Sequence, residues 1–278
     1  MSDQKLLVLP GLSPGLSASR MLAQLRQASP GLASVDGVEL LDLIERTAAA
    51  GRSGADGLAE TVADVLEERG AHRVTLIAES VGATAALRLA ALRPGLVAHL
   101  VLCAPFGYAR PLSGTWHPRS SAGTVVRDLY LGDKGRSRAA LEVLSGGADL
   151  VPEGLLDEYH RAQDDAVFKA ATTLADWIEN GSLTPMESSK GDRVRQTKVP
   201  VSLVWGRDDT VAGVDSAFYL SRRLKDVQLR IFNKLGHLVF AQGGARIAGH
   251  VASVLAQVAA EDSAGEVTAP AEKIRSGA

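Results

Sequence analysis

The chain contains 278 residues with a mass of 29.1 kDa, which is long enough for one α/β domain that carries an insertion. Hydrophobic residues make up 46% and charged residues 22%, proportions that exclude an intrinsically disordered chain. Lys and Arg total 30 against 32 Asp and Glu, a net charge of -2, so no basic excess is available to neutralise a nucleic-acid backbone.

The first hundred or so residues alternate predicted strands with predicted helices. Short apolar runs that end at turn residues such as Pro10-Gly11 indicate buried strands, and apolar residues at helical spacing indicate the helices between them. The predicted strands are Lys5–Leu9, Val38–Leu43, Arg73–Ala78 and Val97–Cys103, and the predicted helices are Leu16–Ala28, Ala59–Arg69 and Val81–Leu92. This order predicts an α/β fold with a mostly parallel sheet covered by helices on both faces.

The alternation stops between Phe106 and Lys198, where the pattern predicts helices only, over Thr124–Leu131, Arg138–Leu144 and Val167–Ile178. It resumes with predicted strands Val199–Val204 and Val227–Phe232 and helices Val214–Leu224 and Ala245–Ala259. We therefore expect a core formed by residues 1–105 and 199–260, an inserted helical cap at 106–198 and a disordered tail at 261–278, where the residues are small and polar.

The cysteine content and the apolar runs suggest a compartment. Cys103 is the single cysteine, which excludes an intrachain disulfide and a cysteine-based metal site and fits a reducing environment. The first residues lack the apolar core of a secretory signal, and no run of about 18 apolar residues occurs. The sequence predicts a cytoplasmic protein without a membrane or nucleic-acid partner.

Ser80 lies where a predicted strand turns into a predicted helix, within Ala78-Glu-Ser-Val-Gly82. Small residues two before and two after a serine allow a tight strand-to-helix turn that projects the hydroxyl above the sheet, beside a helix N-terminus. Serine is also a common helix N-cap, so this segment alone leaves a nucleophile and a structural cap equally open. For Glu79, beside it, packing between helix and sheet and a bond to a structural partner are both open.

Asp209 and His237 also follow predicted strands. Either Asp208 or Asp209 could orient an imidazole, although an acidic turn is the commoner role for such a pair, and a loop histidine is usually solvated. The carboxyl ends of parallel strands meet at one edge of a sheet. The order Ser80, Asp209, His237, each at such an end, therefore predicts a catalytic triad.

These segments together resemble the α/β-hydrolase superfamily, in the branch with a helical lid, over nearly all of residues 5–259. Ala78–Gly82 resembles the nucleophile elbow, Trp205–Asp209 resembles the acid loop and selects Asp209 over Asp208, and Gly236-His237 resembles the glycine–histidine pair. The resemblance implies an α/β-hydrolase fold with the triad Ser80-His237-Asp209.

The resemblance also implies an oxyanion hole formed by the backbone amides of Leu12 and Val81, with an acyl-enzyme intermediate and neither a metal nor an organic cofactor. The chain departs from the family pattern at four places: Pro10 replaces a histidine, Ala78 replaces the first elbow glycine, Phe240-Ala-Gln242 lies where a glutamate is frequent, and the two leading strands of larger members are missing. These departures remove no catalytic atom but weaken any transfer of substrate identity.

Aromatic residues are concentrated in the predicted cap, which holds seven of the twelve in the chain: Phe106, Tyr108, Trp116, Tyr130, Tyr159, Phe168 and Trp177. This bias predicts an apolar pocket over the site, although packing between cap helices explains most single aromatics equally well. We expect Tyr108, Trp116, His117 and Trp177 to contact substrate.

Three functions fit these features. The first is a serine hydrolase of an apolar small-molecule ester, thioester or related acyl compound. The second keeps the triad in a lyase, cyclase or acyltransferase of a natural-product pathway, for example one that eliminates a carboxylate. The third is a ligand-binding protein without catalysis, which an intact triad disfavours because a receptor has little use for Asp209.

Overall fold

The computed structural model describes residues 5–32, 35–108, 122–184 and 193–267. Six parallel strands form one open sheet in the order β2-β1-β3-β4-β5-β6. The strands are β1 (Leu6–Leu9), β2 (Asp36–Gly37), β3 (Val74–Glu79), β4 (Val97–Cys103), β5 (Val201–Gly206) and β6 (Val227–Phe232). All of β3 and β5 is buried, as continuous apolar strands of a sheet covered on both faces should be. The mostly parallel sheet covered on both faces that the sequence predicts is thereby confirmed.

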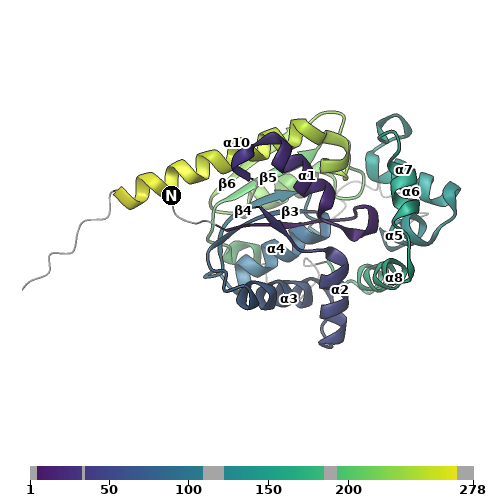
Figure 1. The fold of residues 1–278 in the computed structure, drawn as a ribbon, viewed down its shortest axis with the longest axis horizontal. Helices are drawn as coiled ribbons and strands as arrows, with labels where there is room; N and C mark the ends of the chain where they lie inside the picture. The colour runs from purple at the N-terminus through teal and green to yellow at the C-terminus, as the bar shows by residue number, and fades with distance from the viewer. Residues whose placement is uncertain (1–4, 33–34, 109–121, 185–192, 268–278) are drawn as a thin grey trace, which may run out of the picture.

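Helices cover both faces of this sheet. In Figure 1, α3 and α4 lie on one face and α1 and α10 on the other, and α10 extends well beyond the sheet. The helices are α1 (Ser19–Ala28), α2 (Leu40–Ala49), α3 (Gly54–Glu68), α4 (Ser80–Leu92), α5 (Ala122–Leu131), α6 (Lys134–Ser145), α7 (Leu155–Arg161), α8 (Asp165–Glu179), α9 (Val214–Ser221) and α10 (Val239–Val267). Most residues of α4 are buried, many of them Ala and Leu, and the helix packs between the sheet and α3.

The predicted strand Val38–Leu43 was wrong. Strand β2 has only two residues, and α2 begins at Leu40. Leu40, Leu43 and Ile44 are buried on one face of α2, at the spacing of a helix rather than a strand. Helix α10 also departs from expectation, because it begins at Val239, changes direction at the non-helical Gly244 and continues to Val267 through part of the predicted tail; residues 268–278 lie outside the described residues.

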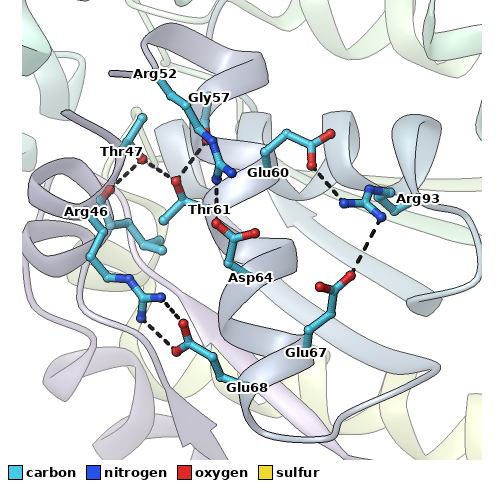
Figure 2. Close-up of polar contacts among 11 residues, drawn as sticks. Arg46, Thr47, Arg52, Gly57, Glu60, Thr61, Asp64, Glu67, Glu68 and Arg93 are labelled. Carbon is cyan, nitrogen blue, oxygen red and sulfur yellow. Dashed lines mark hydrogen bonds and ion pairs between the residues drawn. The ribbon is translucent and has the colours of Figure 1, made fainter. Parts of the chain in front are cut away.

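Polar contacts join α2, α3 and α4 (Figure 2). At the centre, the buried hydroxyls of Thr47 and Thr61 lie 2.8 Å apart, and Thr61 donates to the Gly57 carbonyl. Around them are ion pairs that join Arg46 to Glu68, Arg52 to Asp64, and Arg93 to Glu60 and Glu67. Ion pairs this exposed add little stability each, so the buried threonine pair and the apolar contacts fix the position of α2.

Helices α5 to α8 form the segment between β4 and β5, and no strand occurs in its described part. They gather at one side of the sheet in Figure 1. The register pairs Leu9 with Ala78, Glu79 with Cys103, and Gly206 with Phe232, so the strands end together. The loops that carry the candidate residues therefore leave from one edge, and buried Cys103 lies at that edge.

Candidate active site

The turn between β3 and α4 holds Ser80 in a strained conformation. Its φ is +52°, a left-handed backbone that a serine rarely adopts. The loop after β1 presses against this turn: a Cβ on Gly82 would lie 2.4 Å from the Pro10 carbonyl oxygen, and one on Gly11 would lie 2.5 Å from Ser80 Cβ. Two glycines are therefore needed where the backbones meet. Ser80 is the first residue of the helix rather than its N-cap, which is Glu79.

The three predicted residues lie in one line of hydrogen bonds. Ser80 Oγ is 2.7 Å from His237 Nε2, and His237 Nδ1 is 2.8 Å from Asp209 Oδ2. A carboxylate only accepts, so Nδ1 donates its hydrogen to Asp209 and Nε2 is left to accept from the Ser80 hydroxyl. All three side chains are buried, with His237 fully inaccessible to solvent.

Asp209 has both of the roles that the sequence left open. Its Oδ1 accepts from the backbone N–H groups of Val211 and Ala212, each at 2.8 Å, which is the acidic turn. Its Oδ2 holds the imidazole. The turn fixes the carboxylate plane and so aims the second oxygen. The imidazole is thus held by Asp209 rather than Asp208, whose N–H donates to the Leu235 carbonyl and which packs against Gly146 at the end of α6.

The charges around His237 favour its protonated form. Burial alone lowers the pKa of His237. The charge of Asp209, the hydrogen bond to Asp209 and the charge of Glu79 outweigh this effect and raise the pKa above its ordinary value. A base whose cation is stabilised in this way is suited to accept a proton from a hydroxyl.

Glu79 is a further buried group that the sequence did not assign. Its Oε1 accepts a 2.8 Å hydrogen bond from the N–H of Phe240, near the start of α10, so the structural partner is the correct alternative. Burial raises the pKa of Glu79 to about 7, partly offset by the Phe240 N–H and by His237. Its position next to Ser80, at the end of a fully buried strand, was the signal available in the sequence.

The two predicted oxyanion donors lie on either side of the close contact between the β1 loop and the elbow. Val81 is the second residue of α4, and Leu12 follows Gly11 in a tight turn in which the Ser13 N–H donates to the Gly11 carbonyl at 2.9 Å. The contact between Gly11 and Ser80 brings this turn to the nucleophile.

The predicted substrate contacts have different outcomes. Tyr108 is buried and lies two residues after Phe106. The Phe106 N–H donates to the Ser80 carbonyl, and the Phe106 carbonyl accepts from Thr84, so this segment is attached to the elbow. Trp177 is buried in α8, a helix that contacts α5, α2 and α3, and its contact with substrate stays a prediction. Trp116 and His117 lie outside the described residues.

The end of α6 is attached to the histidine loop. The His237 N–H donates to the Leu144 carbonyl at 2.7 Å. Gln242 donates to the carbonyls of Ser145 and Leu150 and accepts from the Gly236 N–H. This glutamine, noted in the sequence only as a departure from the family pattern, therefore joins the inserted helices to the loop that carries the imidazole.

Neither a metal-binding cluster nor a membrane-spanning helix occurs in the described ranges. No group of three or more His, Cys, Asp or Glu side chains there has an arrangement that could hold a metal ion. Nor does any helix within those ranges combine the length and the apolar character needed to cross a bilayer.

A model of the alpha/beta hydrolase fold matches residues 44–244. The chain belongs to this family. The match includes the elbow, the acid loop and the histidine loop of this alpha/beta hydrolase chain, whereas the β1 loop with Leu12 precedes the matched residues.

Relatives and solved structures agree with this membership. The chain is 23% identical over 183 residues to a 2-hydroxy-6-oxononadienedioate/2-hydroxy-6-oxononatrienedioate hydrolase of Pseudomonas sp, covering 64% of this chain and 62% of that protein. A similarly named hydrolase of Dechloromonas aromatica is 24% identical over 184 residues, covering 64% and 61%. The match thus spans about six tenths of the length of these curated relatives.

The fold is shared with proteins of varied activity. A meta-cleavage product hydrolase from Pseudomonas fluorescens IP01 superposes with a TM-score of 0.69 at 16% identity, covering 91% of each chain. A carboxylesterase from Bacillus subtilis superposes with a TM-score of 0.61, also at 16% identity, covering 92% of this chain and 85% of that one. At such identities the likeness concerns the alpha/beta hydrolase fold alone.

Proposed function

We propose that this protein is a serine hydrolase in which Ser80 is the nucleophile, His237 the general base and Asp209 the residue that orients the base. The observation that carries the proposal is the pair of hydrogen bonds of 2.7 and 2.8 Å that joins the three buried side chains. The strained backbone at Ser80 supports it, because such strain is retained where the surrounding structure and the chemistry require it.

In this mechanism Ser80 Oγ attacks the carbonyl carbon of the substrate while His237 Nε2 takes its proton. Asp209 stabilises the imidazolium that forms. His237 then gives the proton to the leaving group as the bond to it breaks, which leaves an acyl group on Ser80. A water molecule, deprotonated by His237, attacks this acyl-enzyme and releases a carboxylic acid.

The amides of Leu12 and Val81 are the proposed donors to the oxyanion. A donor of this kind contributes typically about 3 kcal/mol to stabilising the tetrahedral intermediate. The contact of Gly11 with Ser80 supports this assignment, since it brings the β1 loop beside the start of α4.

The proposed substrate is an apolar small molecule with an ester, thioester or related acyl group, which reacts beneath a cap formed by residues 106–198. Buried Tyr108, attached through its segment to the elbow, supports an aromatic contact near the nucleophile. Trp116 and His117 stay predictions as further contacts. The reaction uses only side chains and backbone of this chain, and we propose that it takes place in the cytoplasm.

The names of the relatives favour a second candidate substrate. Both are hydrolases of 2-hydroxy-6-oxo dienedioates or trienedioates, in which the group open to attack is a ketone. The same serine, base and oxyanion donors could act on such a carbonyl, with a carbon atom as the leaving group.

The proposal is tested by labelling with a fluorophosphonate probe, followed by peptide mass spectrometry. We expect the wild type to be labelled on Ser80, the Ser80→Ala variant to be unlabelled, and the Ser216→Ala variant, which removes another buried serine, to be labelled normally. Labelling of Ser80→Ala on a different serine would overturn the assignment.

Substrate class is tested by turnover of p-nitrophenyl esters and of a 2-hydroxy-6-oxo dienoate. Turnover of the esters supports the acyl hydrolase, and turnover of the dienoate alone supports the second candidate. A reactive Ser80 with neither activity would contradict both and favour the lyase or acyltransferase alternative.

A further inference from the structure

Two buried tyrosines from the inserted helices bind the loop that carries the proposed oxyanion donor. Tyr159 of α7 donates a hydrogen bond to the Leu12 carbonyl, and Tyr130 of α5 donates to the Ser13 carbonyl at 2.7 Å. Each side chain is 1% exposed, and the two rings pack edge to face with centroids 5.5 Å apart. The loop is thus fixed by residues more than a hundred positions away in the chain.

The bond made by Tyr159 continues through the backbone to the Leu12 amide. The Leu12 carbonyl, which accepts from Tyr159, and the Ser13 N–H belong to the same peptide group. This N–H donates to the Gly11 carbonyl at 2.9 Å. The Gly11 carbonyl belongs in turn to the peptide whose N–H is that of Leu12. A relay of two peptide groups therefore joins the Tyr159 hydroxyl to the Leu12 N–H.

We propose that Tyr159 is a positioning residue that holds the Leu12 N–H toward the oxyanion. The inference rests on the proposed function, in which Leu12 is an oxyanion donor. Hydrogen bonds in a chain polarise one another, so Tyr159 both fixes the orientation of the two peptides and strengthens the donor at the end of the relay. Without it, the Leu12 carbonyl loses a buried donor, and rotation of the turn becomes less costly.

Helix α7 is also held beside the loop by contacts that do not involve the Tyr159 hydroxyl. An ion pair joins Arg20 of α1 to Glu158, next to Tyr159, and the end of α7 packs against Gly15. Helix α7 therefore stays beside the loop when the Tyr159 hydroxyl is removed. Burial and the charge of Glu79 raise the pKa of Tyr159, which keeps the hydroxyl protonated as a donor.

Tyr130 provides a matched control. It has the same burial and the same kind of bond, and its hydroxyl also interacts with that of Tyr159. The Ser13 carbonyl that it binds also accepts from the Leu16 N–H and lies outside the relay, because its peptide ends at Pro14, which has no N–H. Tyr130→Phe and Tyr159→Phe remove one buried hydroxyl each. A purely structural role for both predicts similar losses of Tm and similar kinetics.

The test compares the two variants in the rate constant for fluorophosphonate labelling of Ser80 and, with any ester that is turned over, in kcat and KM. We expect Tyr159→Phe to lower the labelling rate and kcat roughly tenfold, with KM nearly unchanged, which is less than the roughly 10²–10³-fold loss on removing an oxyanion donor outright. Tyr130→Phe should lower Tm to a similar extent but stay within about twofold in rate.

Wild-type labelling and kcat in Tyr159→Phe would overturn the positioning role and leave the triad intact, because the triad is tested separately by Ser80→Ala. Should Tyr159→Phe not fold, 3-fluorotyrosine at position 159 keeps the ring and makes the hydroxyl a stronger donor. The labelling rate then rises for substitution at 159 and stays unchanged for substitution at 130; equal rates at both positions would overturn the inference.

Discussion

The backbone N–H of His237 donates a hydrogen bond of 2.7 Å to the carbonyl of Leu144, so the loop that carries the imidazole is bound to the last turn of α6. The loop that carries Asp209 has a similar attachment, since Thr210 Oγ1 donates to the Val143 carbonyl at 2.7 Å. The end of α6 therefore supports two members of the candidate triad. Unfolding of the inserted helices should therefore displace both Asp209 and His237.

Gln242→Ala should weaken this attachment. The substitution removes bonds to Ser145, Leu150 and Gly236, all of them part-buried, at a cost of about 1 kcal/mol. We expect a lower free energy of unfolding together with slower fluorophosphonate labelling of Ser80. Gln257→Ala, an exposed change on the same helix, is the control, and equal effects of the two variants would contradict the proposed support.

Asp209→Asn should disable the base while keeping the turn. The amide oxygen can still accept from Val211 and Ala212, but the amide nitrogen would donate to His237 Nδ1 and select the tautomer in which Nε2 carries hydrogen. Nε2 then cannot accept the Ser80 proton. We expect kcat to fall by about 10⁴-fold with an unchanged Tm. Asp208→Asn should retain full activity, and equal losses in both variants would exclude this role.

Glu79→Gln should remove a pH dependence of stability. The unfolded carboxyl loses its proton near pH 4.5 and the folded one near pH 7, so the folded state binds more protons between these values and the free energy of unfolding falls as the pH rises. The expected fall is about 3 kcal/mol. The glutamine oxygen can still accept from Phe240. Urea unfolding between pH 4.5 and 7.5 measures the difference, and parallel curves for the two proteins would refute it.

The same substitution should move the pH–rate profile. Burial lowers the pKa of His237, whereas Asp209 and the charge of Glu79 raise it, so replacing Glu79 with a neutral group lowers that pKa. The acid limb of kcat/KM, or of the labelling rate, is expected to shift to lower pH in Glu79→Gln. A shift to higher pH would contradict this sign.

Gly82→Ala should disrupt the elbow. Its new Cβ would lie 2.4 Å from the Pro10 oxygen and 2.7 Å from the Leu9 oxygen, both backbone atoms, so the β1 loop or α4 must move. Such overpacking costs about 1–3 kcal/mol and should also slow labelling of Ser80. Gly249→Ala on α10 meets no atom within 4 Å, and should stabilise the protein by about 0.5–1 kcal/mol. Unfolding experiments on both variants check the contrast.

The strands and helices that are long and strongly patterned could be predicted from the sequence. Strands β4 and β6 have the predicted bounds, because β4 is a mostly apolar run and β6 alternates apolar with polar residues. The errors concern segments where local pattern is ambiguous. Val38–Leu43 has too few residues for its apolar spacing to separate helix from strand, and α2, which begins at Leu40, packs on both α3 and α8. Helix α7 was missed because Leu155 and Tyr159 are its two buried apolar positions among polar neighbours.

The meeting of Ser80, His237 and an aspartate was predictable because parallel strands bring their ends to one edge, whereas the choice of Asp209 over Asp208 came from the resemblance to the acid loop. The supporting contacts were not predictable. Tyr159 with Leu12, Gln242 with Ser145, and Glu79 with Phe240 each join residues far apart in sequence whose meeting depends on how the inserted helices and α10 pack. No periodicity or motif in one sequence encodes such pairings.

Cys103 gives this fold an internal reporter. It is the one cysteine in the sequence, lies fully buried at the end of β4 between Glu79 and Val204, and burial raises the pKa of its thiol. A thiol reagent can therefore reach it only when the centre of the sheet opens. The rate at which the thiol reagent modifies Cys103 under native conditions measures how often the edge beneath the nucleophile becomes exposed, and no cysteine has to be introduced for the experiment.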